Sequence, residues 1–571
     1  MRAPAVVVSS ADTGREPPAN NTPARLLRQR TLLALAGVLI CFAAIAGQLV
    51  RLALKSGPEI RTNLAEPIGR SWSRPDIVDR QGRLLATDVA VHSLYADPHL
   101  LLDLDEVIEK LTGALPGLDG GELRKALGDR GRRFAWIARG LSPRQAKRVH
   151  ELGLPGLAFR TELKRAYPVG ALAGHVLGTV NVDNKGLAGI ERMLDDNGMV
   201  EAVQGSTRTK RPPLRLSLDI GAQHALADEL RQASGQYKAA GAASIVLDVA
   251  SGEVLAAASL PEPDPGRPAE WLDPARLDRL TTGVYELGSI CKALTVAMAL
   301  DGGVADLDSM YDVRQPLAAG PYTFKDLHPQ NRPLSVRDIF LHSSNVGAGL
   351  MALEVGAERQ RAFLSGLGLL ETMRTEAGAV APPLLPKTWG RAETITIAYG
   401  HGIAVAPLQF AGAAAALFNG GDRIAPTFLA GKAEETPRRR ILSAASSAKI
   451  REIMRLNVTH ASGTGRRAEA EGYRVGGKTG TAEMAGRGGY QEKAVISSFL
   501  GAFPMDAPKY LTLVLLFEPQ SGETGNRITA GLNAAPTTAR IVQRIAPVLG
   551  VLPRLVEARA PAPFDAPPEA Q

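Results

Sequence analysis

Hydrophobic and polar residues alternate in different ways along this 571-residue chain, and the first distinct pattern is an uncharged apolar run. It extends from Thr31 to Val50 and is bounded by Arg30 and Arg51. A helix of about 20 residues rises about 30 Å, which matches the hydrocarbon core of a bilayer. The pattern therefore predicts a transmembrane helix over 31–50, preceded by a cytoplasmic tail over 1–30.

The orientation of this segment follows from its basic flank. Arg25, Arg28 and Arg30 precede the apolar run, and such residues usually stay in the cytoplasm, so the rest of the chain would be exported. A cleaved signal peptide is the alternative, because Ala44-Ile45-Ala46 matches a small-x-small cleavage pattern. The apolar run continues past that site, which favours an uncleaved anchor.

Shorter patterns follow between about residue 70 and residue 205. The stretch "DIVDRQGRLLATDVAVHSLYAD" has a turn at Gln81-Gly82 between two extended runs, and helix-like pieces lie beyond it. The polar, basic stretch "QGSTRTKRPP" at 204–213 is typical of a linker. These patterns predict a small α+β pedestal domain with its linker over 51–213.

A larger domain is predicted from Leu214 onward. Two apolar runs flank a hairpin signal at Ala250-Ser251-Gly252, a helical stretch covers about 284–420, and three strand patterns come late, in "YRVGGKTGTAE", "AVISSFLGAFP" and "YLTLVLLFEP". Helices are expected at "IGAQHALADELRQAS" and "TTARIVQRIAPVLG". Two early and three late strands predict a five-stranded antiparallel sheet with flanking helices and an inserted helical subdomain, over 214–552. A disordered tail is expected over 553–571.

Composition narrows the possible functions. The formal net charge is +8, but basic residues are scattered and lack the aromatic-rich stripe that binds nucleic acid. Cys41 and Cys291 are too few and too far apart in sequence for a disulfide framework or a thiolate metal site. No HExxH occurs. No metal or other cofactor is expected.

A candidate nucleophile lies in "GVYELGSICKALTVAMALDGG", where Ser289 and Lys292 are three positions apart. On a helix these positions share a face, so the lysine amine would lie beside the hydroxyl. Burial among apolar side chains, or a second cation nearby, would favour a neutral amine that can take the serine proton. Backbone N–H groups at the helix start could stabilise an oxyanion, and Gly288 would leave room for a substrate.

The same spacing recurs at Ser446 and Lys449, where helix capping and a solvated lysine explain the pattern. The spacing alone is therefore weak evidence for a nucleophile. Two further motifs strengthen the first copy: Ser343 and Asn345 in "LHSSNVGAG", and Lys478-Thr479-Gly480-Thr481 on a predicted strand. In this order, the three motifs form a serine–lysine acyl-transferase set.

With these motifs the sequence resembles class B penicillin-binding proteins, the monofunctional peptidoglycan D,D-transpeptidases, and most closely the division type often called penicillin-binding protein 3. The resemblance extends from the membrane segment to about residue 550. It rests on "RPDIVDRQGRLLAT", "GLAGIERMLDD", "YELGSICK", "HSSNVG", "YGHGIAVAPLQFAGAAAALFNGG", "VGGKTGTAEM" and "SSFLGAFP". It implies a membrane-anchored α+β multidomain chain, with a pedestal (dimerisation-like) domain before a penicillin-binding transpeptidase domain.

The resemblance also implies a role for each matched residue. Ser289 would be acylated, Lys292 would be its general base, Ser343 would relay a proton to the leaving amine, and Asn345 would orient the peptide. Lys478 would add positive charge, and Thr479 and Thr481 would hold the terminal carboxylate. Backbone N–H groups of Ser289 and Thr481 would form the oxyanion hole. Gly480 would let an extended peptide dock along the strand edge.

The chain departs from the family at Leu287, where Pro is common, and at Ile290-Cys291, where Thr-Phe is common. All matched catalytic positions are kept, so activity is expected, whereas β-lactam affinity is left open. A β-lactamase is disfavoured because residues 377–392 contain no acid that could serve as a deacylating base. A non-catalytic β-lactam-binding division scaffold is the alternative from another class.

The resemblance implies a single-pass inner-membrane protein at the division site, with its catalytic domain in the periplasm. Its expected partners are peptidoglycan stem peptides, β-lactams, the membrane, a membrane glycosyltransferase and other division proteins. Asn345 favours the division type, because elongation-type enzymes tend to carry Asp there. An elongation role is the second alternative.

Overall fold

The computed structural model describes residues 36, 38–48, 70–204, 206–208, 211–432, 438–486, 489–520 and 529–554. Its contacts divide the chain into two units, Met1–Ile68 and Gly69–Gln571. In the first unit, residues 38–48 are helical and exposed, and the described part of the chain contains no helix of the length and apolarity that a bilayer crossing requires. The rest of the predicted anchor at 31–50, the tail at 1–30 and most of the tail at 553–571 lie outside the described residues.

The pedestal is an α+β structure built on one long strand, β3 (Leu84–Ala96). β3 pairs antiparallel with β4 (Ala135–Leu141), β5 (Leu157–Ala166) and β2 (Ile77–Val78). The hairpin of β2 with β3 is the one that the turn at Gln81-Gly82 predicts. Leu94, Leu111 and Leu127 belong to an apolar cluster between these strands and the nearby helices. The remaining elements are α2 (Leu104–Ala114), α3 (Gly120–Leu127), α4 (Pro143–His150), α5 (Gly174–Leu177), α6 (Gly189–Asp196), β1 (Arg70–Ser73) and β6 (Glu201–Gln204).

A fully buried ion-pair network joins the two pedestal segments that carry family motifs. The side chains of Arg74, Arg165, Asp88 and Glu191 have no exposed surface. Glu191 accepts from Arg74 Nε at 2.7 Å and from Arg165 Nε at 2.6 Å, and Asp88 accepts from Arg165 at 3.2 Å. Removing one partner from such a network leaves an unpaired buried charge, which costs about 3–5 kcal/mol. The network therefore fixes the segment near Arg74 against α6.

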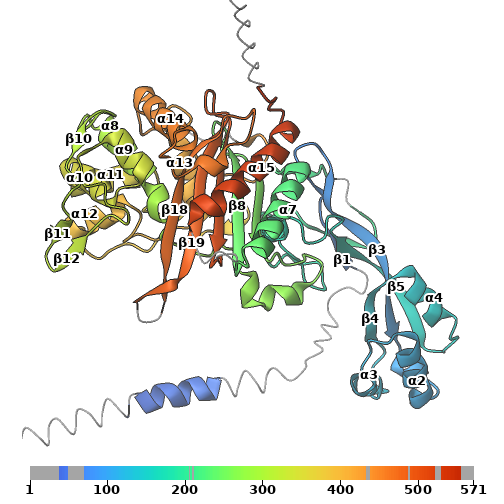
Figure 1. The fold of residues 1–571 in the computed structure, drawn as a ribbon. Helices are drawn as coiled ribbons and strands as arrows, with labels where there is room; N and C mark the ends of the chain where they lie inside the picture. The colour runs from blue at the N-terminus through green and yellow to red at the C-terminus, as the bar shows by residue number, and fades with distance from the viewer. Residues whose placement is uncertain are drawn as a thin grey trace, which may run out of the picture. The chain divides into compact units, whose positions relative to one another are not determined.

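The second domain is built on a five-stranded antiparallel sheet, as the sequence predicts (Figure 1). Its strand order is β18-β19-β20-β8-β9, so two early strands lie beside three late ones. The strands are β8 (Gly241–Asp248), β9 (Val254–Leu260), β18 (Gly476–Gly486), β19 (Gly489–Phe503) and β20 (Tyr510–Phe517). The short strand β7 (Leu214–Arg215) pairs instead with β2 in the pedestal.

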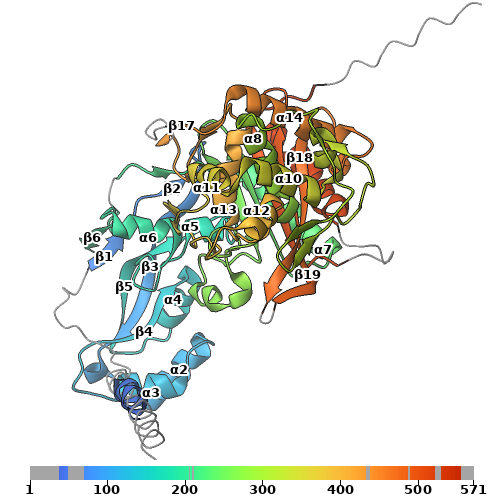
Figure 2. The ribbon, with the colours of Figure 1, turned by 90° about the vertical axis from the view of Figure 1, so that its left-hand side faces the viewer.

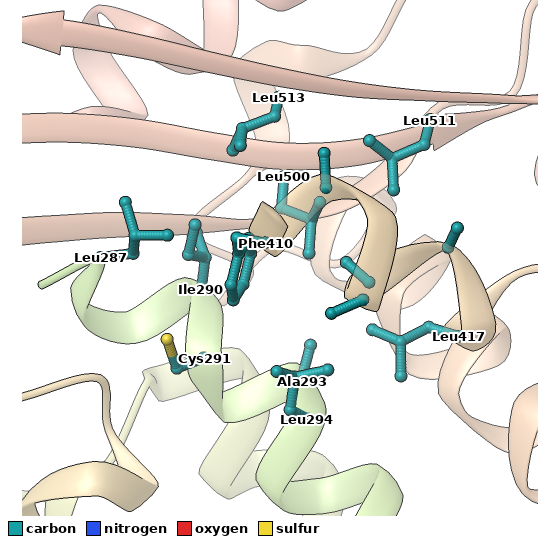
Figure 3. Packing of buried hydrophobic residues seen from close by; sticks show 14 of the residues in the cluster. Leu287, Ile290, Cys291, Ala293, Leu294, Phe410, Leu417, Leu500, Leu511 and Leu513 are labelled. Atoms are coloured by element: carbon teal, nitrogen blue, oxygen red, sulfur yellow. The ribbon is translucent and has the colours of Figure 1, made fainter. Parts of the chain in front are cut away.

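Alternate residues of this sheet face two apolar layers. Val246 and Val514 pack with α7 (Ile220–Gln236) and α15 (Ala534–Val548), the two predicted helices, whereas Ile245 faces the opposite cluster. That cluster contains α8 (Lys292–Asp301) and α13 (Pro407–Ala414). Figure 3 shows Phe410 of α13 between the turn around Ile290 and the strand residues Leu500, Leu511 and Leu513. The turn that precedes α8 is thereby fixed against the sheet.

The predicted helical stretch at 284–420 is not continuous. Short hairpin strands interrupt it, as in "LAAGPYTF", where Gly320-Pro321 form the turn of one hairpin. Figure 2 shows the helices α8 and α10 to α13 grouped together. Its remaining elements are α9 (Val336–His342), α10 (Asn345–Val355), α11 (Ala357–Gly366), α12 (Arg391–Ala398), β10 (Met310–Tyr311), β11 (Leu317–Ala319), β12 (Tyr322–Phe324), β13 (Leu334–Ser335), β14 (Arg374–Thr375) and β15 (Gly378–Ala379). Later come β16 (Asp422–Arg423), β17 (Arg439–Arg440) and α14 (Ala444–Thr459).

Candidate active site

Ser289 lies on a single 3-10 turn, η4 (Gly288–Cys291), immediately before α8. The sequence predicts it in the first turn of the helix itself, so the observed position is slightly earlier. Gly288 has φ +60, and a Cβ there would lie 2.9 Å from the Thr481 carbonyl oxygen. Glycine is therefore required by the backbone conformation and by close contact with β18, rather than by access of a substrate.

The amine of Lys292 is the point at which the first two motifs meet. Its Nζ lies 3.0 Å from Ser289 Oγ, 3.0 Å from Ser343 Oγ and 2.7 Å from Asn345 Oδ1. It also lies 2.5 Å from the Ser343 carbonyl oxygen. A neutral amine has two N–H donors for the carbonyl and amide oxygens, and one lone pair that can accept the Ser289 proton. The predicted grouping of these four residues is present in the structure.

Burial is the main cause that holds the pKa of Lys292 well below its usual value, and the positive charge of Lys478 acts in the same direction. The carboxylate of Asp326 acts in the opposite direction, but it is the smaller influence. The Lys292 side chain is 1% exposed. Lys292 can thus serve as a base without a second proton-accepting residue.

Ser343 and Asn345 are placed by the junction of α9 and α10. Ser343 follows the last residue of α9 with φ 58 and ψ 43, a left-handed conformation that is uncommon for residues other than glycine. Asn345 is the first residue of α10. This junction points the Ser343 hydroxyl and the Asn345 amide at Lys292.

Asp326 holds this junction in place, and the sequence analysis missed it. Its carboxylate accepts from Ser344 Oγ at 2.6 Å, from Asn345 N at 2.5 Å and from Val346 N at 2.9 Å. A charged acceptor for the N–H groups that begin α10 is a strong cap. The only sequence signal is one acid in the polar loop "KDLHPQN", which does not distinguish it from a surface residue.

The third motif lies on β18, where side chains alternate between two faces. Lys478 is fully buried; its Nζ donates to the Thr479 carbonyl at 3.2 Å and lies 5.7 Å from the centre of the Phe340 ring. Burial lowers its pKa to about 7. Thr479, Thr481 and Glu483 line the cleft instead.

Gly480 faces away from the cleft. A Cβ at this position would lie 2.5 Å from Ser498 Oγ and 2.9 Å from the Leu287 carbonyl oxygen. Packing therefore explains glycine at this position, and docking of a peptide along this strand edge stays a prediction. Glycine is needed because the turn that carries Ser289 lies directly against β18.

These groups open into a cleft of about 1450 Å³. Its walls include Ser289, Ser343 and Asn345, with Thr464, Arg466 and Arg467 near Thr479, and with Tyr399 and His401 from the segment after α12. Burial lowers the pKa of His401, so its imidazole tends to be neutral. The described residues hold no cluster of three or more His, Cys, Asp or Glu that could bind a metal.

The remaining sequence candidates behave as expected from their surroundings. Cys291 is buried, and burial raises the pKa of its thiol to about 12, which makes it a poor nucleophile. Lys449 of the second Ser-x-x-Lys copy pairs with Asp306 at 2.8 Å, and its side chain is 41% exposed. Ser446 lies in the first turn of α14, where Ser443 is the N-cap.

The fold and this set of groups match a serine acyl-transferase in which a buried lysine lies beside the serine hydroxyl. Residues 242–543 match the penicillin-binding protein transpeptidase domain, and residues 71–197 match the penicillin-binding protein dimerisation domain. The chain therefore belongs to the penicillin-binding protein family, and it has the class B arrangement, in which the dimerisation domain precedes the transpeptidase domain.

Curated relatives support this membership along most of the chain. The chain is 38% identical to a probable peptidoglycan D,D-transpeptidase FtsI of Caulobacter vibrioides, over 85% of this chain and 82% of that protein. It is 32% identical to a probable peptidoglycan D,D-transpeptidase PenA of Neisseria meningitidis, over 84% and 85%. It is 28% identical to the peptidoglycan D,D-transpeptidase FtsI of Escherichia coli K12, over 85% of each.

A solved structure shares the fold. A peptidoglycan synthetase from Bifidobacterium adolescentis matches with a TM-score of 0.65 and 22% identity, over 86% of this chain and 98% of that one.

Proposed function

We propose that this protein is a peptidoglycan D,D-transpeptidase that cross-links stem peptides through an acyl-enzyme on Ser289. The observation that carries the proposal is the position of one buried amine, Lys292, within 3.0 Å of both serine hydroxyls. The names of the relatives, which include peptidoglycan D,D-transpeptidases of the FtsI type, support the same reaction.

In the first half of the reaction, Lys292 takes the Ser289 proton while Oγ attacks the carbonyl carbon of the donor's penultimate residue. The resulting oxyanion would be held by the backbone N–H groups of Ser289 and Thr481. The C–N bond to the terminal D-alanine then breaks. Ser343 delivers the proton to the leaving amine, since its Oγ lies 3.0 Å from the Lys292 amine that received it.

In the second half, an amine from a neighbouring stem peptide attacks the acyl-enzyme carbonyl. It gives its proton to the Ser343–Lys292 pair, the new amide bond forms, and Ser289 Oγ regains a proton as it leaves. Asn345 orients the donor peptide through its side-chain amide. Thr479 and Thr481 bind the terminal carboxylate, and Lys478, buried on the other face of β18, adds positive charge while it is protonated.

A transpeptidation assay tests this reaction with the full-length protein in detergent. The reagents are a synthetic donor that ends in D-Ala-D-Ala and an excess of an amine acceptor, and mass spectrometry identifies the products. We expect a donor–acceptor amide from the wild type and none from Ser289→Ala. Hydrolysis of the donor without amide formation would contradict the proposal and indicate a hydrolase.

We also propose that the protein acts at the division site and is anchored by the segment 31–50. FtsI-type relatives and Asn345 support the division role, and the apolar run supports the anchor. A membrane glycosyltransferase and other division proteins are the proposed partners. On depletion in its own cells, we expect filaments with blocked septa; rounded cells that still divide would assign it to elongation.

The anchor has a separate test. The intact mass of the protein extracted from membranes is expected to correspond to the uncleaved chain. A mature N-terminus at Gly47 would show instead that the segment is a cleaved signal peptide.

A further inference from the structure

A chain of hydrogen bonds reaches the cleft from a buried side chain outside the catalytic motifs. Thr479 Oγ1 and Thr464 Oγ1 are 2.7 Å apart, and Thr464 Oγ1 lies 3.3 Å from Asn457 Oδ1. Asn457, near the end of α14, is fully buried. Thr464 and Thr479 both line the cleft, so the chain ends where a substrate would bind.

The direction of this chain is set by backbone groups. Asn457 Nδ2 donates to the Gly477 carbonyl at 2.8 Å, and Asn457 Oδ1 accepts from Thr464 N at 3.1 Å. A carbonyl only accepts and an N–H only donates, so the amide cannot be flipped. The amide oxygen therefore faces the Thr464 hydroxyl, which must donate to it. The Thr464 oxygen is then left to accept the proton of Thr479.

The loop that carries Thr464 is fixed as closely as the amide. A Cβ at Gly463 would lie 2.1 Å from the Asn457 carbonyl oxygen, and one at Gly465 would lie 3.0 Å from Asn457 Nδ2. The two glycines thus let the loop lie directly against the end of α14, which keeps the Thr464 hydroxyl beside Thr479.

A carboxylate ligand would reverse the direction of the chain. A carboxylate only accepts hydrogen bonds, so Thr479 must turn its one proton toward the cleft. Thr464 can then donate to Thr479 and gives up only its long 3.3 Å contact with Asn457, whose oxygen keeps the bond from Thr464 N. Thr481 needs no such change, because its Oγ1 already accepts from Ala530 N at 3.4 Å.

We propose that Thr464 is a positioning residue: when a carboxylate is bound, it donates to Thr479 Oγ1 and holds the Thr479 proton toward the cleft, and it thereby gives this cleft its preference for substrates ending in a free carboxylate. Arg466 and Arg467 line the same cleft, and their positive charge favours an anionic ligand. The inference rests on the proposed transpeptidase function, since it concerns the terminal carboxylate of the donor.

The test compares two donors that differ only at the C-terminus, one ending in free D-alanine and one in D-alanine amide. The second-order rate constant for acylation of the full-length protein is measured for each. In Thr464→Val, we expect the value for the acid to fall about 5-fold, because the variant loses the hydrogen bond between the two hydroxyls that holds the Thr479 proton toward the carboxylate. The value for the amide should change less than about twofold, because a neutral amide depends less on a charge-assisted bond.

Two further variants separate positioning from structure. Thr464→Ser keeps the hydroxyl and should restore the preference for the acid. Thr459→Val makes the same chemical change at an exposed cleft residue that does not belong to the hydrogen-bond chain, since its hydroxyl donates to the Arg455 carbonyl. This variant should leave the rate constants of acylation by both donors unchanged. An equal loss on both donors in Thr464→Val, or no loss on the acid, would overturn the inference.

Failure of the proposed function gives a different result. A wild type that forms no product from either donor would contradict the transpeptidase proposal. In that case the inference is tested with a β-lactam that has a free carboxylate and with its methyl ester. The rate at which each compound labels Ser289 is compared between the wild type and Thr464→Val. A Thr464→Val variant that keeps the wild-type ratio between those two compounds would overturn it.

Discussion

Ser289 lies on the turn before one helix of the transpeptidase domain and Lys292 begins that helix, whereas Ser446 and Lys449 lie in the first turns of another. The spacing is the same in both copies. Lys292 is 1% exposed and contacts two serine hydroxyls and an amide oxygen, whereas the side chain of Lys449 is 41% exposed and pairs with Asp306. The motif therefore places two groups on one face, but burial and convergent neighbours create the nucleophile.

The two lysines also differ in the charges around them. Burial and the nearby Lys478 lower the pKa of Lys292, so that its amine can be neutral and accept a proton. Lys449 lies at the surface beside a carboxylate, which stabilises a cation. A general base needs the buried environment of Lys292. The exposed environment of Lys449 suits a charged lysine on the surface of a helix.

The largest expected difference concerns the two lysines themselves. Lys292→Met should lower the rate of acylation by a fluorescent penicillin about 1000-fold, the usual contribution of a positioned base. Lys449→Met should leave this rate unchanged. Stopped-flow labelling of both purified variants measures the rates, and a similar loss in both would contradict the distinction between the copies.

Asp326 provides a second test, because it acts on Lys292 and on the start of α10. Asp326→Asn removes a charged acceptor from the N–H groups of Asn345 and Val346, and we expect acylation to slow about 10-fold or more. It also removes a charge that raises the pKa of Lys292. The acidic limb of the pH profile should therefore move to lower pH.

The control for this variant is Asp312→Asn, an exposed acid whose partner is Arg314. It should leave both the rate and the pH profile unchanged. A shift of the acidic limb to higher pH in Asp326→Asn would contradict the proposed electrostatics.

The pKa of Lys478, about 7, predicts a further pH effect of several-fold. This group has a folded pKa below its usual value, so it is cationic below about pH 7 and loses its charge as the pH rises through that value. Binding of a donor carboxylate should weaken over the same interval. Weaker binding means a higher KM. We therefore expect the KM for the D-Ala-D-Ala donor to rise from pH 6 to pH 8 in the wild type and to stay constant in Lys478→Met.

The smallest effect is expected at the second Ser-x-x-Lys copy, at the start of α14. Ser443 caps α14 by accepting from Ser446 N at 3.1 Å, so Ser443→Ala should lower the free energy of unfolding by about 1 kcal/mol. Acylation at Ser289 should be unaffected. Denaturant unfolding followed by circular dichroism measures the first quantity, and penicillin labelling measures the second.

Much of the architecture could be predicted because its signals are local. Apolar runs and turn residues predicted the hairpin around Gly252, the three late strands and the two helices that cover one face of the sheet. The first two motifs likewise predicted the pairs Ser289–Lys292 and Ser343–Asn345, since each motif constrains its own element, and the resemblance to the family predicted that the two pairs meet.

Other features could not be predicted because they depend on contacts between distant segments. Asp326 caps a helix that begins nearly 20 positions later, beyond β13 and α9, and the polar loop around Asp326 carries no characteristic pattern. The role of Gly480 depends on the approach of Leu287, and the chain from Asn457 to Thr479 depends on a loop lying against a strand. Pairings of this kind leave no spacing rule in the sequence.

The account's central claim is that environment selects Ser289 over Ser446, and adduct mapping tests it most directly. The purified full-length protein is labelled with a fluorescent penicillin, digested and analysed by mass spectrometry. We predict a single adduct on Ser289, and no labelling of Ser289→Ala. An adduct on Ser446, or labelling that survives Ser289→Ala, would contradict the account.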